Sequence, residues 1–455
     1  MKHLKKTIAC LLALLLMASL FALPAGAVGF TPPFEIAAPA AYVVNTDTNI
    51  IVYEKNSEEP LQAASLTKVM TVILMLEEYG DNLDGVSATV SDVAENYVYI
   101  HGGSHADIRR GESRTLREML YAMLLPSANE AALAVAELMG GGSWSNFVAM
   151  MNARAKDIGC TATTFTDPCG LDEGNITTAR DMYLILRYAM SFDQFKTAAN
   201  TYRFVMNDIP RYSPGTYAIV NTNKMLTTAG LDFHREYTQG GKTGVLGEWQ
   251  NFAGWHVQDG MTYISVVLNS PNSCDPNHAK DPVTYRTPRP ALSETGLLMD
   301  WAFESFSLQN ALDVGQPITE VPVKYATETD TLRLYPADSM YTLLPAGGDG
   351  SVTQKTFHLP ETVAAPVKQG DVIGTVTLSL SGEVIGTVEL IAERDISRNT
   401  VLYVVEKIVE FFGSLYFRVV VVLTIIAVVL YLAWYANYLM RRANSRKVRR
   451  SRPED

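Results

Sequence analysis

The chain has 455 residues, of which 47% are hydrophobic, and a formal net charge of −11 at pH 7. This length exceeds one ordinary domain and predicts two folded units with additional segments. Setting aside the basic residues at both ends leaves a charge of about −19 on the part between them, which argues against nucleic acid as a partner.

The cysteines give no metal signature. Cys10 lies in the N-terminal leader, and Cys160, Cys169 and Cys274 lack the spacing of metal ligands. A disulfide between Cys160 and Cys169 and three unpaired thiols are both open alternatives. No metal site and no cofactor is expected, and the histidines show no pairing that suggests one.

The N-terminus is typical of a secretory signal peptide. Three lysines within the first six residues precede an apolar run from Ile8 to Leu23, and Ala-Gly-Ala at positions 25–27 supplies small residues for cleavage. We predict a signal peptide over residues 1–27. The chain after it is therefore expected outside the cytoplasm.

Strand and helix patterns between residues 36 and 308 predict an α/β (α+β) domain. Helices lie between strands from both ends of this segment, so its sheet is expected to combine distant pieces. The predicted strands lie in Ala41–Tyr53, which contains a turn, in Asn251–Trp255 and in Met261–Leu268. The predicted helices are Ser65–Tyr79, Leu116–Met139, Thr178–Tyr188 and Ala291–Phe306.

The pattern changes after about Leu308 to short alternating segments separated by Gly and Pro turns. Such segments, among them Glu320–Tyr325, Thr331–Tyr335 and Val372–Leu378, predict a small all-β sandwich domain over residues 309–395. Residues 400–417 follow as an amphipathic juxtamembrane segment that we expect along the outer leaflet.

Val419 to Met440 is an uncharged apolar run long enough to cross a ~30 Å hydrocarbon core as a transmembrane helix. A buried core helix is the alternative, but core helices seldom stay apolar on every face for so long. Residues 441–455 form a basic tail, which is held on the cytoplasmic side and meets anionic lipid. We expect a single-pass cell membrane protein with its folded domains extracytoplasmic and its C-terminus cytoplasmic.

Three short motifs carry the chemistry, and the first is Ser65-Leu66-Thr67-Lys68. Ser65 and Lys68 are three residues apart at a predicted helix start, which places hydroxyl and amine on one face. A serine becomes a good nucleophile when a base takes its proton, and a lysine is that base only if its pKa is lowered. Alone, such a pair is usually a helix cap and a solvated lysine.

The second motif is Ser127-Ala128-Asn129, for which an ordinary helix N-cap is the alternative interpretation. The third is Lys242-Thr243-Gly244, which follows two glycines and is otherwise a Gly-rich turn. A phosphate loop is excluded, because it would require glycine in place of Glu236 and a helix afterwards.

In this order, the three motifs form the set described for penicillin-binding proteins and β-lactamases. The chain resembles the low-molecular-mass penicillin-binding proteins, the serine-type D-alanyl-D-alanine carboxypeptidase family, from about Pro39 to Phe306. The likeness is carried by residues 60–77, 111–137, 165–182 and 240–244. The segment up to about Asp395 is similar to the C-terminal β-sandwich domain of that family.

The resemblance implies the roles of the site residues. Ser65 is expected to be the acylated nucleophile and Lys68 its general base. The backbone N–H groups of Ser65 and Val245 are expected to form the oxyanion hole. Ser127 would relay protons as a third catalytic residue, and the remaining residues would bind substrate: Asn129, Lys242, Thr243, Gly244 and Val245.

The implied reaction removes the terminal D-Ala from peptidoglycan stem peptides ending in D-Ala-D-Ala, with β-lactams as inhibitors. The chain departs from the family where Val245–Phe252 separate the third motif from Ala253-Gly254, which puts substrate preference in doubt. Glu130 also replaces a more usual Asp. Within the similar segments, Asp167, Arg180 and Asp181 are expected to be structural.

Three other functions share parts of this sequence pattern. A class A β-lactamase needs a Glu-x-x-Leu-Asn stretch, which the sequence lacks. A cross-link endopeptidase of the same fold uses the same residues and stays open. A non-catalytic sensor that binds peptidoglycan or β-lactams is disfavoured, because all three motifs are intact and the tail is too short for a signalling domain.

Overall fold

The computed structural model describes residues 31–207, 209–227, 233–271, 290–347, 353–380 and 383–450. The predicted signal peptide, Cys274 and residues 451–455 lie outside these ranges. The chain divides into two compact units. One contains the residues up to Ala311 with Tyr341–Gln354 and Leu378–Gly386, and the other contains Leu312–Met340, Lys355–Thr377 and the residues from Thr387 on.

A five-stranded sheet of order β2-β1-β11-β10-β9 forms the centre of the first unit. Its strands are antiparallel to their neighbours, and β1 pairs with β11 so that Ala40 lies opposite Leu268. The predicted hairpin and the predicted combination of distant pieces are therefore confirmed. The strands are β1 (Ala40–Asn45), β2 (Ile50–Lys55), β9 (Thr238–Leu246), β10 (Trp249–Gln258) and β11 (Met261–Pro271).

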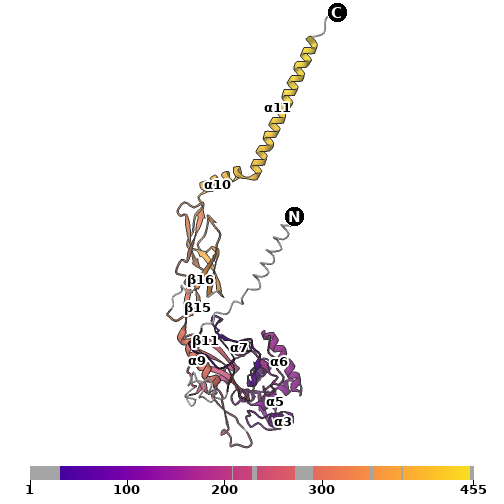
Figure 1. Ribbon diagram of the computed structural model, residues 1–455, viewed down its shortest axis with the longest axis vertical. Coiled ribbons are helices and arrows are strands. Elements are labelled where there is room, and N and C mark those ends of the chain that lie inside the picture. Colours follow the sequence, from indigo (N-terminus) through magenta and orange to yellow (C-terminus); the bar gives the residue numbers. More distant parts are fainter. Residues whose placement is uncertain are drawn as a thin grey trace, which may run out of the picture. The chain divides into compact units, whose positions relative to one another are not determined.

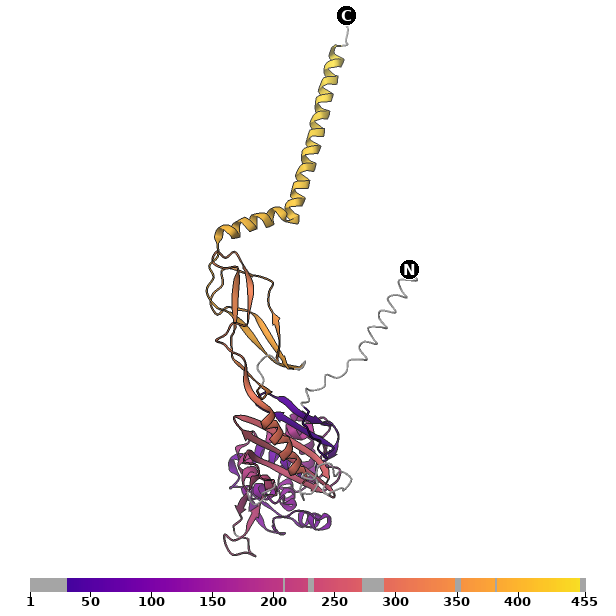
Figure 2. The same ribbon diagram turned by 60° about the vertical axis from the view of Figure 1, so that its left-hand side comes forward.

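Both faces of this sheet are buried, because alternate residues of a strand point to opposite sides. Tyr42 and Val44 pack into a large core with the main group of helices. Ala41 and Val43 pack into a second core with the C-terminal helix of the unit, α9 (Pro290–Ser305). Figures 1 and 2 show α9 along one face of the sheet, with α5, α6 and α7 on the other side. The predicted α/β layering is confirmed.

The helices match the predictions except at two places. The helix expected from Ser65 begins as a 3-10 turn, η1 (Ala64–Thr67), before α2 (Lys68–Tyr79). The helical stretch predicted over Leu116–Met139 is divided into α4 (Leu116–Leu124) and α5 (Asn129–Met139), and α5 begins at the second motif. Ser127, between them, has φ of 68°, a left-handed conformation that no α-helix continues through.

The remaining elements of this unit are short or lie at its surface. The helix predicted at Thr178 is confirmed, because the Thr178 side chain caps α7 by accepting from Asp181 N–H. The helices are α3 (Asp92–His101), α6 (Trp144–Ile158), α7 (Ala179–Ala189) and α8 (Asp193–Asn200), with 3-10 turns η2 (Gly80–Asn82) and η3 (Lys224–Leu226). Three two-stranded sheets pair β3 (Leu61–Gln62) with β6 (Ile176–Thr177), β4 (Ser87–Thr89) with β5 (Ser113–Thr115), and β7 (Arg203–Val205) with β8 (Ala218–Val220).

The chain after α9 is built from strands, as predicted. A six-stranded sheet has the order β16-β18-β19-β14-β13-β17, and β12 pairs with β15. The alternating segments named above coincide with β13, β14 and β18. The strands are β12 (Phe306–Leu312), β13 (Thr319–Lys324), β14 (Thr331–Pro336), β15 (Met340–Pro345), β16 (Thr353–His358), β17 (Val363–Ala364), β18 (Val372–Leu380) and β19 (Glu383–Ala392).

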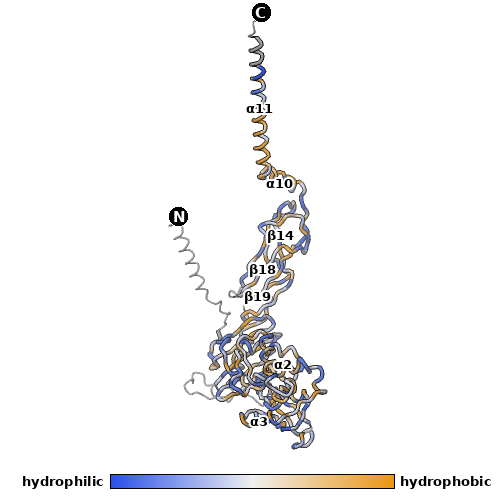
Figure 3. The backbone as a smooth tube through the Cα atoms, turned by 90° about the vertical axis from the view of Figure 1, so that its right-hand side faces the viewer, coloured by the Kyte–Doolittle hydropathy of each residue, from blue (hydrophilic) through white to orange (hydrophobic). Residues whose placement is uncertain are grey.

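Two helices close the described chain, α10 (Thr400–Gly413) and α11 (Leu415–Arg450). The stretch Leu415–Arg442 of α11 is long and apolar enough to cross a membrane, and none of its apolar window is buried in protein. Figure 3 shows this apolar stretch followed by hydrophilic residues toward the C-terminus. At 1.5 Å per residue the stretch is about 42 Å long, more than a hydrocarbon core of about 30 Å requires. The alternative of a buried core helix is wrong.

Candidate active site

Ser65 and Lys68 are in direct contact at the start of α2. Lys68 Nζ lies 2.9 Å from Ser65 Oγ, and it also donates to Asn129 Oδ1 and to the Cys169 carbonyl, both at 2.7 Å. The Lys68 side chain is completely buried, and this burial lowers its pKa below the ordinary lysine value of 10.5. The alternative of a solvated lysine is therefore wrong, and this amine meets both requirements of a base for Ser65.

The backbone before Ser65 is held in an unusual conformation. Ala64 has φ of 48°, which is uncommon for a residue with a Cβ. The Asn251 amide donates to the carbonyls of Gln62 (2.8 Å) and Ala63 (3.0 Å). At Gly170, a Cβ would lie 1.9 Å from the Ala64 carbonyl oxygen, so only glycine permits this approach. These contacts from distant segments fix the direction of the serine side chain.

Ser127 and Lys242 form a second contact between the predicted site residues. Lys242 Nζ donates to Ser127 Oγ at 2.9 Å and to the Thr243 carbonyl at 2.7 Å. The Lys242 side chain is buried, so desolvation, with the Lys68 charge as a smaller cause, lowers its pKa well below 10.5. Both alternative interpretations are wrong here: Ala128, not Ser127, is the N-cap of α5, and Lys242-Thr243-Gly244 lies in strand β9 rather than in a turn.

Strand β9 is the edge of the sheet and brings the third motif to the first. A Cβ on Gly244 would lie 3.3 Å from both the Ala63 carbonyl oxygen and Ala64 Cβ, so this strand and η1 touch. The Thr243 hydroxyl lies 2.6 Å from the Thr222 hydroxyl. Val245, the next residue, has a largely exposed side chain. The eight predicted site residues therefore lie on neighbouring elements: η1, α2, α5, β9 and the loop before α5.

Asn129 joins these groups. It is the first residue of α5, its Oδ1 accepts from Lys68, and its backbone N–H donates to the Ser104 carbonyl at 3.0 Å. Sequence reasoning did not find the Cys169 carbonyl, Asn251 or Thr222. A backbone carbonyl carries no sequence signal, and the two polar side chains lie outside the three motifs.

Asp167 supports the base from behind. Its buried carboxylate accepts five hydrogen bonds. Four come from the backbone N–H groups of Cys169, Gly170, Leu171 and Asp172, and one comes from the Tyr97 hydroxyl. This network shapes the turn that presents the Cys169 carbonyl to Lys68. The expected structural roles are confirmed for Asp167 and also for Asp181, which binds N–H groups of Thr161 and Ala162, while Arg180 pairs with Glu58.

Asp167→Asn is expected to lower the free energy of unfolding by about 3 kcal/mol, because an amide nitrogen would face backbone N–H groups and leave them unpaired. Thermal unfolding of the full-length protein measures this loss of stability. The rate of penicillin acylation measures whether the turn still presents the Cys169 carbonyl to Lys68. Asp157→Asn is the matched control, since that carboxylate is 67% exposed on α6. An unchanged melting temperature in Asp167→Asn would contradict the role of this carboxylate.

The longer spacing after the third motif has a structural counterpart. The residues Val245–Phe252 extend β9 and β10 into a longer hairpin, in which Trp249 pairs with Leu246 and is 42% exposed. Cys160 and Cys169 are both free thiols, so the alternative of a disulfide between them is wrong. In the described ranges, no group of three or more His, Cys, Asp or Glu side chains is placed to hold a metal ion.

The fold and the three motifs define a serine enzyme of the penicillin-binding class. Comparison with known proteins makes this specific: the chain belongs to the D-alanyl-D-alanine carboxypeptidase family, whose model matches residues 27–272. Residues 306–398 match the C-terminal domain of penicillin-binding protein 5. The protein is therefore a serine hydrolase with D-alanyl-D-alanine carboxypeptidase activity.

Individual relatives cover most of the chain. D-alanyl-D-alanine carboxypeptidase DacF of Bacillus subtilis is 28% identical over 79% of this chain and 86% of its own length. DacC of Escherichia coli is 26% identical over 84% of this chain and 90% of its own length. The solved penicillin-binding protein 5 of Haemophilus influenzae, 25% identical, covers 81% of this chain and all of its own with a TM-score of 0.57. A D-alanyl-D-alanine endopeptidase of Escherichia coli is 28% identical over 42% of this chain and 59% of its own length.

Proposed function

We propose that this protein releases the terminal D-Ala of peptidoglycan stem peptides through an acyl-enzyme on Ser65. The observation that carries the proposal is the 2.9 Å contact between Ser65 Oγ and the buried amine of Lys68. An amine whose pKa is lowered by burial is neutral at lower pH than a free lysine and can accept the serine proton.

Acylation begins when Lys68 takes the Ser65 proton and Oγ attacks the carbonyl carbon of the penultimate D-Ala. The Oγ–C bond forms, and the oxyanion is bound by the backbone N–H groups of Ser65 and Val245. The C–N bond then breaks, and the leaving amine of D-Ala receives, through Ser127, the proton that Lys68 took from Ser65. The Thr243 hydroxyl and the Lys242 amine bind the terminal carboxylate, and Gly244 leaves room for the peptide beside β9.

Deacylation repeats the sequence with water. Lys68 takes a proton from water, the hydroxide adds to the acyl carbon, and the Oγ–C bond breaks as Ser65 recovers its proton. Asn129, which touches Lys68, orients the peptide amide. A β-lactam acylates the same oxygen, but its opened ring stays attached, so the leaving group cannot depart.

The test is D-alanine release from diacetyl-Lys-D-Ala-D-Ala by the purified full-length protein in detergent, with penicillin adduct formation followed by intact mass. Release of D-alanine and a stoichiometric adduct are the expected results. An adduct without D-alanine release would favour a cross-link endopeptidase or a sensor. Carboxypeptidase activity is the better supported function, because carboxypeptidase relatives align with about 80% of the chain and the endopeptidase with 42%.

The proposal includes the layout of the chain in the cell envelope. The signal peptide comprises residues 1–27. The catalytic domain comprises residues 36–308 and the β-sandwich domain residues 309–395, and the family matches over 27–272 and 306–398 support these two domains. Residues 400–417 lie on the outer leaflet and 419–440 cross the membrane, in agreement with the apolar stretch of α11. Residues 441–455, rich in arginine, are on the cytoplasmic side.

A further inference from the structure

Thr222 touches the third motif from outside it. It lies just after β8, and its hydroxyl is 2.6 Å from the hydroxyl of Thr243, which binds the terminal carboxylate in the proposed mechanism. The Thr222 hydroxyl also donates to the Leu125 carbonyl at 3.2 Å, and the Thr222 backbone N–H donates to the same carbonyl at 3.0 Å. Leu125 caps the C-terminus of α4, shortly before Ser127. Thr222 therefore connects the turn of the second motif to the strand of the third.

The backbone on both sides of Thr222 is held by buried asparagines. The Asn221 amide donates to the carbonyls of Ala199 (3.2 Å) and Thr201 (3.0 Å), and its Oδ1 accepts from the Asn223 N–H at 2.9 Å. Thr222 itself is only partly buried. The position of its hydroxyl is therefore set by these neighbouring bonds and does not depend on the contact with the third motif.

The contact between the two threonines has a direction. A hydroxyl has one proton and donates one hydrogen bond, whereas a carboxylate only accepts. While the Thr222 hydroxyl donates to Leu125, the bond to Thr243 has to run from the Thr243 hydroxyl to the Thr222 oxygen. When a carboxylate binds, Thr243 has to donate to it instead. The contact between the two hydroxyls then persists only if Thr222 becomes the donor.

This reversal costs little. The bond that Thr222 gives up, to Leu125, is the longer of its two at 3.2 Å against 2.6 Å. The Leu125 carbonyl keeps a partner, because the Thr222 N–H still donates to it. Thr243 also becomes a better donor when a second hydroxyl donates to its oxygen, since hydrogen bonds in a chain polarise one another. The Thr222 hydroxyl is therefore placed to strengthen the bond from Thr243 to the carboxylate.

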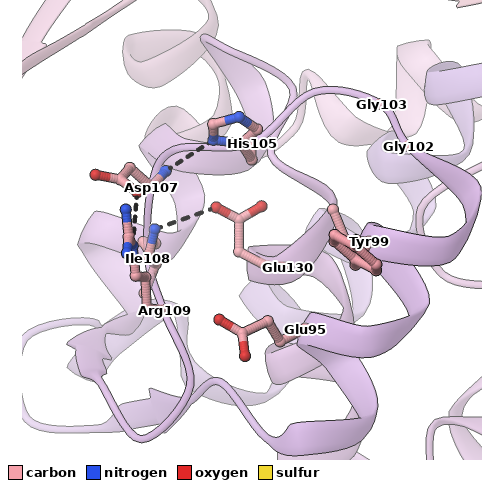
Figure 4. Close-up of a pocket in the computed structure, with 10 residues that line it drawn as sticks. Glu95, Tyr99, Gly102, Gly103, His105, Asp107, Ile108, Arg109 and Glu130 are labelled. Carbon is pink, nitrogen blue, oxygen red and sulfur yellow. Dashed lines mark hydrogen bonds and ion pairs between the residues drawn. The ribbon is translucent and has the colours of Figure 1, made fainter.

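The helix after the second motif has supports of its own. Glu130 on α5 is 3% exposed and accepts from the N–H groups of Ala106 (2.6 Å) and Ile108 (3.4 Å). Figure 4 shows the bond to Ile108 at the edge of a pocket that Glu130 lines. Loss of the Thr222 hydroxyl would leave this anchor of α5 intact, so its effect should fall on Thr243.

We propose that Thr222 is a positioning residue for the terminal carboxylate of the substrate: its hydroxyl donates to Thr243 and thereby directs the Thr243 proton toward the carboxylate. This inference rests on the proposed function and adds to it a residue outside the three motifs. The pair of threonines makes the terminal carboxylate part of what the enzyme selects. It therefore favours peptides that end one residue after the scissile bond.

The experiment uses the full-length protein in detergent and two thioesters of diacetyl-Lys-D-Ala. In one, the leaving group is thioglycolate, whose carboxylate takes the place of that of the terminal D-Ala. In the other it is the methyl ester of thioglycolate, which has no carboxylate. The ratio of the two kcat/KM values measures recognition of the carboxylate. Thr222→Val keeps the shape of the side chain and is expected to lower this ratio about fivefold, the effect of one hydrogen bond, by slowing only the carboxylate thioester.

Two variants serve as controls. Thr222→Ser retains the hydroxyl and is expected to recover most of the ratio. Thr216→Val makes the same change at an exposed threonine before β8, whose hydroxyl donates to the Ser213 carbonyl, and should keep the parent ratio. Thr222→Ala, which also lacks the hydroxyl, takes the place of the valine variant if that variant does not fold.

An unchanged ratio in Thr222→Val, or equal slowing of both thioesters, overturns the inference, and so does a serine variant that behaves like the valine variant. These outcomes leave the proposed function standing if the parent releases D-alanine from diacetyl-Lys-D-Ala-D-Ala. A parent that releases none from this peptide refutes the proposed function and the inference with it.

Discussion

Ser65→Ala is expected to abolish both D-alanine release and the penicillin adduct, with kcat falling by about 10⁶-fold to the detection limit. The reason is that, among the residues that the structure describes, no other hydroxyl touches the Lys68 amine: its contacts are Ser65 Oγ, Asn129 Oδ1 and the Cys169 carbonyl. Intact mass spectrometry after incubation with penicillin measures the adduct directly, and D-alanine release measures turnover.

Ser143→Ala is the matched control, because Ser143 is exposed and its side chain makes no capping hydrogen bond. This control should acylate as fast as the parent. A penicillin adduct on Ser65→Ala would show that another residue is the nucleophile. The melting temperature of Ser65→Ala should stay close to that of the parent, since the change removes only one oxygen.

Lys68→Met is expected to slow acylation by about 10³-fold while the protein stays folded. Methionine has a similar length and tolerates burial, whereas it cannot accept a proton. Folding is expected to persist, because replacing a buried amine by an apolar side chain removes a desolvation cost. Stopped-flow measurement of acylation by a chromogenic β-lactam gives the rate, and the exposed Lys156→Met on α6 is the control.

The pH dependence of the parent tests the same residue. The base must be neutral, and burial lowers the pKa of Lys68 below 10.5. The acylation rate should therefore rise as pH increases through the pKa of Lys68, on a limb that lies below pH 10.5, and then level off. Lys68→Met should lack this limb. A limb at the value of a free lysine would mean that Lys68 is not buried in the working enzyme.

The central sheet and its helices could be predicted because their signals are local. Short apolar runs rich in β-branched residues mark β1 and β11, and Thr178 caps the helix after it as its residue type predicts. The division between α4 and α5 also has a local signal, because Pro126 interrupts a helix and Ser127 and Asn129 are residue types that favour a helix start. The left-handed conformation of Ser127 is imposed by tertiary contacts, among them the bond from Lys242.

The predicted site residues lie together in the structure. They could be predicted because their types and order are specific as a set. The residues that shape the cleft were harder to find. Cys169 contributes a carbonyl, which every residue has, and Asp167 contributes a network whose partners are backbone N–H groups.

The pairing of β1 with β11 has a consequence for biogenesis. Ala40 meets Leu268 only after more than two hundred further residues have been synthesised, so the sheet has a high contact order. The nucleophile Ser65 on η1 also precedes the start of β9 by more than 170 residues. Chains that end before β11 would lack the central strand, expose apolar surface and be open to aggregation or proteolysis. Synthesis of the chain through β11 therefore has to precede assembly of the catalytic site.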